Sequence, residues 1–564
     1  MLKQSARSIF LKFNKPKSQL RSLSSFPIPA KKNYAHNARN RNWAAAFGLA
    51  VLGGSVISSI ATIKNDEVAK SSNVITVDEF TKHNSKNDCW VAINGKVYDV
   101  TDFIPNHPGG VAPLVLHAGH DATETYEKLH PKGTIEKFLP ADKFLGCLDA
   151  PAPKLEKAYD PDEDERLENI ENIPSLNQIQ NIYDFEKVAK MILPKDAWAY
   201  YSCGSDDEIS MRENHYAYQR IYFRPRVAID VKEVDTSYEL LGTKSSVPFY
   251  VTATALAKLG HPDGECSIAR GAGKENVIQM ISTLSSNSLE EIAHARIPGA
   301  TQWFQLYINE DRKITKELVK KAEDLGMKAI FITVDAPSLG NREKDKRLKF
   351  TNETNVDLGD DADRSSGASK ALSSFIDCSV NWKDIKEVMS WTKLPVLVKG
   401  VQTPEDVILA YDAGCKGVVI SNHGGRQLDT SPPPIEVLAE TIPILKNLGK
   451  ERKDFEILVD GGVKRGTDIL KAVALGGQNI HVSVGLGRPF LYANSGYGEE
   501  GVRKCIQILK SELEMDMRLL GVTNLDQLNQ KYIDTRRLIG RDAPNYLYDN
   551  TYKPIDFVKF VNED

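Results

Sequence analysis

The sequence is short of cysteine and of net charge. Its 564 residues include seven cysteines, none of them in a Cys-x-x-Cys pair, so their spacing indicates neither a disulfide framework nor a zinc site. The 72 Lys and Arg residues nearly balance 76 Asp and Glu residues, for a net charge of −4, and this balance gives no sign of nucleic-acid binding. A chain of this length exceeds one ordinary core, so we expect two or more domains.

Acidic side chains are missing from residues 1–42, which carry ten Lys and Arg residues. Such a segment is typical of a mitochondrial transit sequence. Residues 43–63 are uncharged and long enough to cross a bilayer, although their glycines and serines make them weakly hydrophobic. We therefore expect 1–72 to be a mitochondrial targeting and intermembrane-space sorting segment that contacts a membrane only during import. A permanent membrane anchor and a disordered basic arm remain the alternatives.

The rest of the chain divides by composition. Residues 73–149 form a small unit in which Asn94-Gly95 separates two apolar, β-branched runs, a strong signal for a hairpin. Residues 150–174 are rich in proline and acidic residues, and we expect a linker because so few apolar side chains cannot order it. Residues 175–542 form the largest predicted domain. The tail, 543–564, is rich in Tyr and Pro and is a candidate for contact with a neighbouring subunit.

The large domain contains eight short apolar runs with helical patterns between most of them. One such helix begins with Thr403-Pro404-Glu405-Asp406 and ends at Gly414, which are typical helix caps. The count of runs favours a (β/α)8 TIM barrel over two packed α/β domains, and a barrel places its chemistry at the carboxyl ends of the strands. The predicted strands are 249–255, 277–283, 302–307, 329–336, 395–401, 417–422, 455–461 and 480–486.

Two histidines in the small unit are candidates for haem ligands. His107 lies in His-Pro-Gly-Gly, and His130 follows 23 residues later in Leu-His-Pro. Two neutral imidazoles fill both axial positions of a haem, as an electron carrier requires. His117 and His120 are interpreted instead as surface or capping residues. With residues 90–100, the two motifs resemble the cytochrome b5 haem domain over 74–149, which implies a small α+β fold and a bound haem b (protohaem IX).

Glycines with a basic neighbour follow the last two predicted strands. Gly461-Gly462 is followed by Lys464, and Gly487 is followed by Arg488. One such segment alone would indicate only a turn. Because barrels bind phosphate after strands seven and eight, the pair predicts a cofactor that carries a phosphate.

The sixth strand leads into Ser-Asn-His-Gly-Gly-Arg, which contains the predicted chemical centre. Arg426 can bind a carboxylate through two hydrogen bonds, and His423 has a pKa suited to proton removal near neutral pH. Asp335 can stabilise the imidazolium that forms, and Lys399 can lie against the negative charge of a reduced flavin. Together these groups fit the oxidation of a 2-hydroxy acid. The alternative is a simple β–α turn in which Arg426 makes a structural ion pair.

Residues 175–538 resemble the FMN-dependent α-hydroxy-acid oxidase family, whose signature is close to Ser-Asn-His-Gly-Gly-Arg-Gln-Leu-Asp at 421–429. The resemblance implies that the catalytic residues are His423, Asp335, Tyr307, Arg426 and Lys399. It implies that substrate is bound by Tyr200, Tyr307, Arg342 and Arg426, in a pocket sized for a methyl group by Ala255 and Leu284. It implies that FMN is held by Thr252, Ala253, Thr254, Ser282, Gln305, Thr333, Lys399, Asp460, Gly461, Gly462, Lys464, Gly487 and Arg488.

A cytochrome b5-like domain ahead of such a barrel resembles the lactate-oxidising flavocytochromes. This resemblance implies that L-lactate reduces FMN, that electrons pass singly through haem b to cytochrome c, and that the enzyme is a homotetramer of the mitochondrial intermembrane space. Alternatives are another 2-hydroxy acid such as glycolate or mandelate, an oxidase that reduces O2, and a non-catalytic redox carrier. The chain departs from the family in having Lys464 where Arg is usual, and in a longer connection over 476–483.

Overall fold

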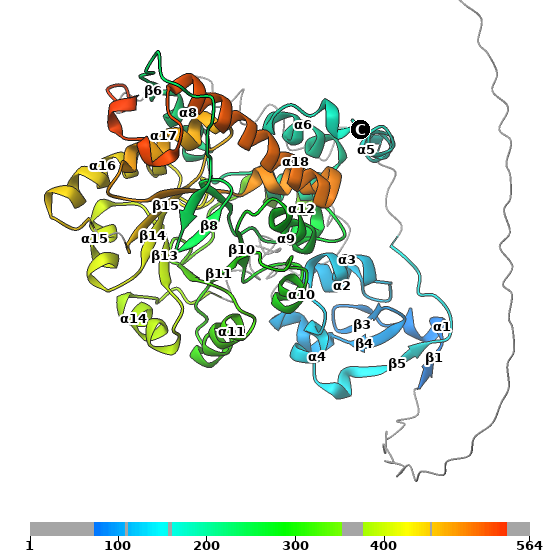
Figure 1. The fold of residues 1–564 in the computed structure, drawn as a ribbon. Helices are drawn as coiled ribbons and strands as arrows, with labels where there is room; N and C mark the ends of the chain where they lie inside the picture. The colour runs from blue at the N-terminus through cyan, green and yellow to red at the C-terminus, as the bar shows by residue number, and fades with distance from the viewer. Residues whose placement is uncertain (1–72, 108–110, 156–160, 352–375, 452–453, 539–564) are drawn as a thin grey trace, which may run out of the picture. The chain divides into compact units, whose positions relative to one another are not determined.

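The structure is a computed structural model that describes residues 73–107, 111–155, 161–351, 376–451 and 454–538 (Figure 1). The predicted sorting segment 1–72 and the predicted tail 543–564 lie outside these residues. Within the described ranges, every helix is too short or too polar to cross a membrane. All seven cysteines fall in those ranges, and none of them forms a disulfide in the structure.

The N-terminal domain is built on a five-stranded sheet in the order β1-β5-β4-β3-β2. Its strands are β1 (Val74–Ile75), β2 (Asn84–Ser85), β3 (Asp88–Ile93), β4 (Lys96–Asp99) and β5 (Phe144–Leu148). The turn between β3 and β4 is the predicted hairpin, in which Asn94 and Gly95 have φ of 53° and 74°, as a two-residue turn of this type requires. The helices are α1 (Val77–Phe80), α2 (Ala112–Leu116), α3 (Thr123–Leu129) and α4 (Thr134–Phe138), with 3-10 turns at Thr101–Asn106 and Ala141–Lys143.

Both faces of this small sheet are covered. The neighbouring residues Val91 and Ala92 of β3 are buried in two separate hydrophobic clusters, because alternate side chains of a strand point to opposite faces. The cluster that contains Val91 also holds Ile104 and takes in Tyr126 at its edge. Phe103 and Tyr126, which pack against this cluster, contact the rings of the two candidate haem ligands, His107 and His130.

The acidic segment between the domains is partly helical, so our expectation that its composition would leave it unordered is wrong for α5 (Pro161–Glu171). Acidic residues occupy its first turn, where the helix dipole favours negative charge. Arg166 donates to both carboxylate oxygens of Glu163, at 2.7 and 2.6 Å, and to the carbonyl of Ile192 at 3.0 Å. These charge-assisted hydrogen bonds stabilise the helix in place of apolar burial.

The large domain is a closed barrel of eight parallel strands (Figure 1), which confirms the predicted fold. Every residue of the eight strands is buried, and this explains why the strands appear in the sequence as continuous apolar runs. Trp303 makes tilted ring contacts with Tyr250 and Phe331, and the ring centres are 5.1 Å apart in both. The strands are β9 (Phe249–Val251), β10 (Gln279–Ser282), β11 (Gln302–Leu306), β12 (Ile330–Thr333), β13 (Val396–Val401), β14 (Gly417–Ile420), β15 (Glu456–Asp460) and β16 (Val482–Leu486).

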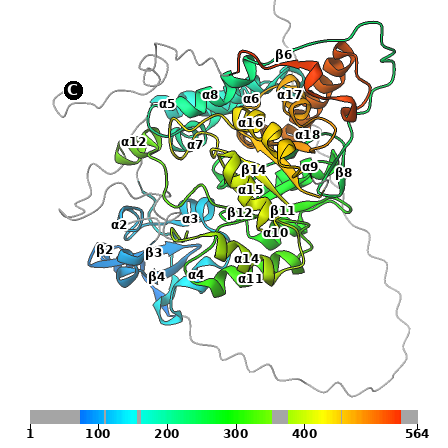
Figure 2. The ribbon, with the colours of Figure 1, turned by 90° about the vertical axis from the view of Figure 1, so that its left-hand side faces the viewer.

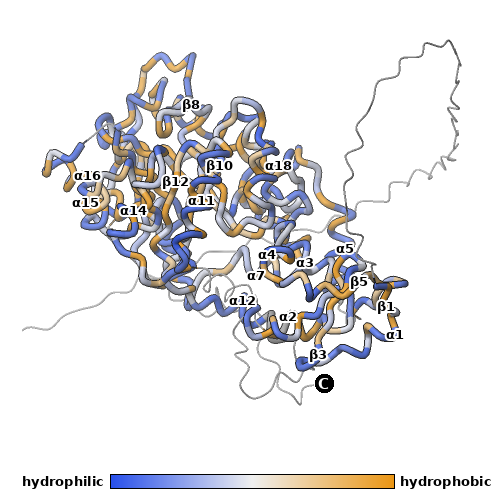
Figure 3. Tube along the Cα trace, turned by 90° about the horizontal axis from the view of Figure 1, so that it is seen from below, coloured by the Kyte–Doolittle hydropathy of each residue, from blue (hydrophilic) through white to orange (hydrophobic). Residues whose placement is uncertain are grey.

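Helices surround the barrel (Figure 2), with apolar and polar residues interspersed along them (Figure 3). The predicted helix after β13 is present as α15, capped by Thr403, whose hydroxyl accepts from the N–H of Asp406 at 3.3 Å. The helices are α6 (Ile182–Ile192), α7 (Lys195–Ser202), α8 (Ile209–Gln219), α9 (Glu265–Lys274), α10 (Leu289–His294), α11 (Arg312–Asp324), α12 (Glu343–Thr351), α14 (Trp382–Trp391), α15 (Pro404–Asp412), α16 (Pro434–Asn447), α17 (Gly466–Gly476) and α18 (Arg488–Leu520).

Two small antiparallel sheets complete the domain. One pairs β6 (Tyr222–Phe223) with β17 (Ile533–Asp534), and the other is the hairpin β7 (Tyr238–Leu240) and β8 (Thr243–Ser245). The N–H of Leu241, in the hairpin turn, donates to the carboxylate of Glu456 at 2.7 Å. Because Glu456 begins β15, this hairpin lies at the amino ends of the strands, away from the end where barrels carry their chemistry.

Candidate active site

The loop after β14 has an unusual backbone. His423, Gly424 and Gly425 have φ of 57°, 65° and 75°, three left-handed residues in succession. For a residue with a side chain this conformation costs roughly 1–2 kcal/mol. The structure therefore holds His423 in a conformation that its own backbone does not favour, a condition that is common at functional sites.

Amide side chains hold this loop in place. Asn422 Oδ1 accepts from the N–H of Gly425 at 3.1 Å. The side-chain amides of Asn422 and Asn214, on α8, form two hydrogen bonds with each other, of 2.8 and 2.7 Å. The carbonyl of Gly425 accepts from the N–H of Ser205 at 2.9 Å. Asn422 and Asn214 are each 1% exposed, so these bonds compete little with water and outweigh the unfavourable backbone.

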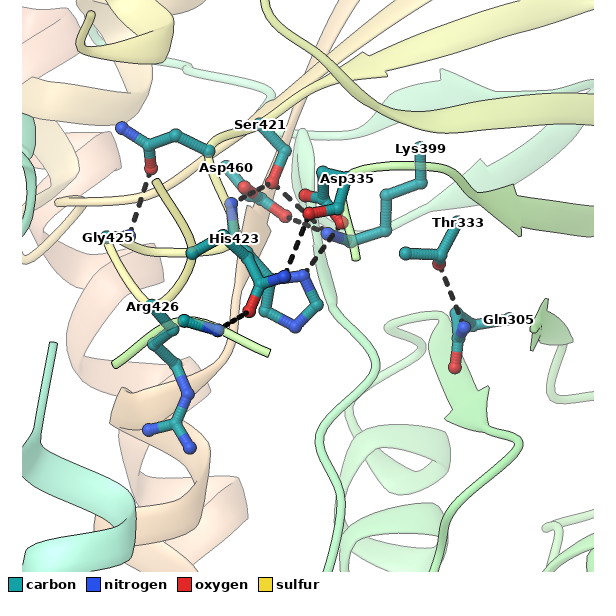
Figure 4. A network of polar contacts seen from close by, with 12 residues as sticks. Gln305, Thr333, Asp335, Lys399, Ser421, His423, Gly425, Arg426 and Asp460 are labelled. Carbon is teal, nitrogen blue, oxygen red and sulfur yellow. Dashed lines mark hydrogen bonds and ion pairs between the residues drawn. The ribbon is translucent and has the colours of Figure 1, made fainter. Parts of the chain in front are cut away.

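His423 is paired with Asp335, as predicted, with Nδ1 and Oδ1 2.9 Å apart (Figure 4). Burial lowers the pKa of His423, whereas the Asp335 charge opposes that shift. Burial raises the pKa of Asp335, but the charges of His423 and Lys399 outweigh burial and hold this pKa below its ordinary value. An ionised Asp335 accepts a hydrogen bond from Nδ1–H, so a neutral His423 presents Nε2 as a base.

Lys399, on β13, lies beside Asp335 and His423 (Figure 4). Its Nζ donates to Ser421 Oγ at 3.1 Å and lies 3.4 Å from Asp460 Oδ2. Burial lowers the pKa of Lys399, but Asp460 and Asp335 more than offset it, and this pKa is raised overall. Lys399 is therefore a buried cation at the carboxyl ends of the strands.

Two guanidinium groups face the same region. Arg426 donates to the carbonyls of Tyr200 and Cys203 at 2.6 and 3.3 Å and lies 4.9 Å from the centre of the Tyr200 ring. Arg342 is 3% exposed, and among the described residues its Nη1 has no hydrogen-bond partner. Burial and then the Arg426 charge lower the pKa of Arg342. Arg342 is buried and Arg426 is half-buried, and such a pair of cations with a donor to spare suits a carboxylate ligand.

The apolar side of this region is a small cluster. Tyr307, Ala336 and Ile376 are buried together and Leu284 packs against them. Burial raises the pKa of Tyr307, so its hydroxyl remains a donor at neutral pH. Ala255, predicted to act with Leu284, packs instead against the main barrel core, and its contact with substrate stays a prediction.

The predicted flavin residues lie at the carboxyl ends of β9 to β12. Gln305 donates to Thr333 at 2.8 Å (Figure 4) and accepts from Ser282 Oγ at 3.3 Å. Among the described residues, Thr252 Oγ1 and Asp460 Oδ1 are buried without a hydrogen-bond partner. Orphaned buried polar atoms are costly unless a ligand satisfies them, so this set fits the polar ring and side chain of FMN. Ala253 and Thr254 follow Thr252 and are half-buried.

The two predicted phosphate loops are tightly packed. A Cβ on Gly462 would lie 2.1 Å from the Asn214 carbonyl oxygen, and one on Gly487 would lie 3.3 Å from the methyl groups of Thr252 and Thr254. Gly461 and Gly462 have φ of 93° and 80°, a region that favours glycine. The first loop thus requires glycine, whereas a side chain at Gly487 would crowd the two threonine methyl groups only slightly.

The two predicted phosphate cations are engaged by protein groups. Arg488 donates to the carbonyls of Tyr201, Cys203 and Gly424 at 2.9, 2.9 and 3.0 Å. Lys464 forms an ion pair with Glu186 at 2.8 Å. Arg488 therefore joins the His423 loop to the segment after α7, and contact of either cation with phosphate remains a prediction.

In the N-terminal domain, His107 and His130 each directly follow a helix, and their ring centres are 6.2 Å apart. Burial lowers the pKa of His130 to about 4, only partly opposed by its bond to the Tyr126 carbonyl. That bond, 3.2 Å from Nδ1, leaves Nε2 as the nitrogen that could bind a metal, an arrangement common for metal-bound histidines. With metal–imidazole bonds near 2 Å, this separation fits one iron between the rings. His117 caps α2 as predicted, but it is buried rather than at the surface.

Two polar residues of the site were not given roles by sequence reasoning. Ser421 accepts from Lys399 and from the N–H of His423 at 3.0 Å, and Gln427 donates to the carbonyl of Asp335 at 2.9 Å. Both lie within the signature that follows β14, and the signal that could have found them is the density of polar residues in a loop next to a buried strand.

Comparison with known proteins agrees with this geometry. Residues 189–535 match the FMN-dependent dehydrogenase family, and residues 76–149 match the cytochrome b5-like haem/steroid binding domain. The chain is 51% identical to L-lactate dehydrogenase (cytochrome) of Wickerhamomyces anomalus, over 96% of this chain and 97% of that protein. It is 47% identical to the enzyme of the same name from Saccharomyces cerevisiae, over 96% of both.

A solved structure of a flavocytochrome b2 variant with pyruvate bound is also similar. It shares 52% identity with a TM-score of 0.63, and the match covers 72% of this chain and all of that one. The family match covers more than half of the chain, and the haem-domain match precedes it. The chain therefore belongs to the FMN-dependent dehydrogenases, as a member that joins a cytochrome b5-like haem domain to the flavin barrel.

Proposed function

We propose that the protein oxidises L-lactate to pyruvate and delivers the electrons through haem b to cytochrome c. The observation that carries this proposal is the His423–Asp335 pair, 2.9 Å apart. The charge of Arg342 acts on His423, and Arg342 also donates to the carbonyl of Arg426. A base beside two cations suits a 2-hydroxy acid, which must lose protons while its carboxylate is held. The names of the relatives that match nearly the whole chain support lactate as the acid.

The substrate carboxylate would bind to Arg426 and to the spare Nη1 of Arg342. Arg426 would exchange a backbone carbonyl for a substrate carboxylate, a stronger, charge-assisted partner. Tyr200 and the protonated Tyr307 would donate to the carboxylate and the hydroxyl, respectively. Leu284, with Ala255, would limit the space for the substrate side chain.

His423 would take up the substrate proton at Nε2, and Asp335 would stabilise the imidazolium through Nδ1. This role is the same whether the α-hydrogen leaves as a proton or as a hydride. Bound FMN would accept two electrons from the substrate, and haem b would carry them away one at a time. Lys399 would offset negative charge on the reduced flavin, because it is a buried cation that Asp335 and Asp460 keep protonated.

The placement of the strand ends supports a set of proposed cofactor contacts. Thr252, Ser282, Gln305 and Thr333 would hold the flavin ring, with Ala253 and Thr254 beside it. The ribityl phosphate would bind at Asp460, Gly461, Gly462, Lys464, Gly487 and Arg488. The haem iron would bind His107 and His130.

Location and assembly complete the proposal. Residues 1–72 would direct the protein to the mitochondrial intermembrane space, where the functional parts are a haem domain at 73–149, a connecting segment at 150–174 and the barrel domain at 175–542. The mature protein would be a homotetramer, with 543–564 in contact with a neighbouring subunit. The acid-free, basic character of residues 1–42 supports the mitochondrial part of this proposal.

An anaerobic absorption spectrum tests the proposal. Addition of L-lactate should bleach the flavin bands and sharpen the reduced b-type haem bands, and cytochrome c should then be reduced. His423→Gln should bind FMN but lose lactate turnover. Lactate turnover in His423→Gln at the wild-type rate would reject the assignment, and a preference for glycolate or mandelate would reject lactate as the substrate.

A further inference from the structure

A buried carboxylate lies between two loops at the carboxyl ends of neighbouring barrel strands. Glu265, the first residue of α9, is 3% exposed. Its Oε1 accepts from the N–H of Ala257, in the loop after β9, and from the N–H of Ser286, in the loop after β10, both at 3.0 Å. Its Oε2 accepts from the N–H of Asn287 at 3.2 Å. One side chain thus binds the backbones of both loops.

Further bonds reinforce this junction. The N–H of Glu265 donates to Asn287 Oδ1 at 3.1 Å, and the N–H of Lys258 donates to Ser286 Oγ at 3.1 Å. Burial raises the pKa of Glu265, and its backbone N–H donors oppose that shift. A carboxylate is the one side chain of this size that can accept from three N–H groups at once.

The two loops also carry the residues expected to size the pocket. Ala255 precedes Ala257 by two residues, and Leu284 precedes Ser286 by two. Leu256, between Ala255 and Ala257, has φ of 59°, and its carbonyl accepts from the Tyr201 hydroxyl at 2.8 Å. Leu284 packs against the cluster that contains Tyr307. A shift of either loop would therefore move one wall of the pocket.

We propose that Glu265 sets the separation of these two loops and is thereby a positioning residue for substrate selectivity. The inference rests on the proposed function, which places Ala255 and Leu284 at the methyl group of lactate. Glu265 touches neither substrate nor cofactor in this account. It excludes longer 2-hydroxy acids by holding the two walls at a fixed distance.

The test compares selectivity in holoenzyme variants of the full chain. Glu265→Gln keeps the shape but replaces one acceptor oxygen with an NH2 group, so at least one loop N–H loses its partner. The ratio of kcat/KM for L-lactate to that for L-2-hydroxy-4-methylpentanoate should fall about tenfold, since a methylene in an apolar pocket is worth on the order of tenfold or more. The loss should arise mainly in KM for lactate, with the longer acid little affected or improved.

Glu456→Gln is the matched control. Glu456 is also a buried glutamate that accepts from a backbone N–H, but it lies at the amino end of β15, and its substitution should leave the selectivity ratio unchanged. Ser286→Ala removes only the bond from Lys258 and should give a smaller shift in the same direction. It decides the question if Glu265→Gln does not fold.

The outcomes separate the two proposals. Suppose that the wild-type enzyme prefers lactate while Glu265→Gln and Ser286→Ala change the selectivity ratio no more than Glu456→Gln does. That result would overturn the role of Glu265 alone. A wild-type enzyme that oxidises neither acid would overturn the proposed function and this inference together. A selective fall in the first two variants would support both.

Discussion

Replacing Asp335 with Asn removes the negative charge beside His423 and keeps a side chain of nearly the same shape. The carboxylate is buried and 2.9 Å from His423 Nδ1. Its proposed task is to stabilise the imidazolium that forms when His423 takes up the substrate proton. The substitution therefore tests the electrostatic part of the proposed mechanism with little change in packing.

The expected effect follows from the separation of the charges. Two unit charges about 4 Å apart interact by about 4 kcal/mol at an effective dielectric constant of about 20. Since about 1.4 kcal/mol corresponds to a factor of ten in rate, loss of this attraction should slow substrate oxidation by about two to three powers of ten. We expect a slowing near the lower of these figures, because the residues around the neutral Asn side chain can relax.

The pH dependence of the reaction rate provides a second test of the same mechanism. Burial lowers the pKa of His423 and Asp335 raises it, so removal of the Asp335 charge should lower this pKa further. Because the neutral imidazole is the active base, the acid limb of the rate profile should move to lower pH in Asp335→Asn, although the maximal rate falls. A purely structural defect would slow the reaction without this shift.

Anaerobic stopped-flow measurement of flavin reduction by L-lactate, at several pH values and equal flavin content, provides the assay. The double variant Asp335→Asn with His423→Gln should be no slower than His423→Gln alone, because Asp335 acts through His423. A slowing of less than tenfold with an unchanged pH profile, or additive losses in the double variant, would refute the reasoning.

Three further predictions concern the other parts of the protein. In Gly462→Ala the new Cβ would meet the Asn214 carbonyl oxygen at 2.1 Å. The control is Gly242→Ala, where φ is similar and nothing lies within 4 Å of the new Cβ, and which should lower the free energy of unfolding in urea by roughly 1 kcal/mol. Gly462→Ala should lower it several-fold more, and equal losses would contradict the clash. His130→Ala should abolish the b-type haem bands while lactate still bleaches the flavin, and retained haem would exclude His130 as a ligand. Burial raises the pKa of Glu456 to about 7. The contribution of this protonated side chain to the free energy of unfolding is therefore complete below the unfolded pKa of about 4.3 and is lost as pH rises through 7. Glu456→Gln should remove up to about 4 kcal/mol of that pH dependence in calorimetry, and an unchanged pH dependence would argue against this protonation.

Sequence alone determined the elements whose signals are local. The eight apolar runs correspond to β9–β16 because parallel strands buried on both faces favour apolar residues at most positions. Asn94-Gly95 predicted its hairpin because few residues adopt two left-handed conformations in succession. The partnership of His423 with Asp335 was inferred from their chemistry at two strand ends, and barrel closure brings such ends together.

Tertiary structure decided the contacts between positions far apart in the chain. Asn214 and Asn422 lie 208 residues apart, and no local pattern indicates that their amides pair. Glu265 looks like an ordinary acidic residue at the start of a helix, yet its carboxylate accepts hydrogen bonds from the loops after β9 and β10. Arg488 was expected to face phosphate, but its carbonyl partners depend on how α7 and the His423 loop meet. Backbone preference and hydropathy act over a few residues, whereas the partner of a buried polar group is chosen by the closed barrel as a whole.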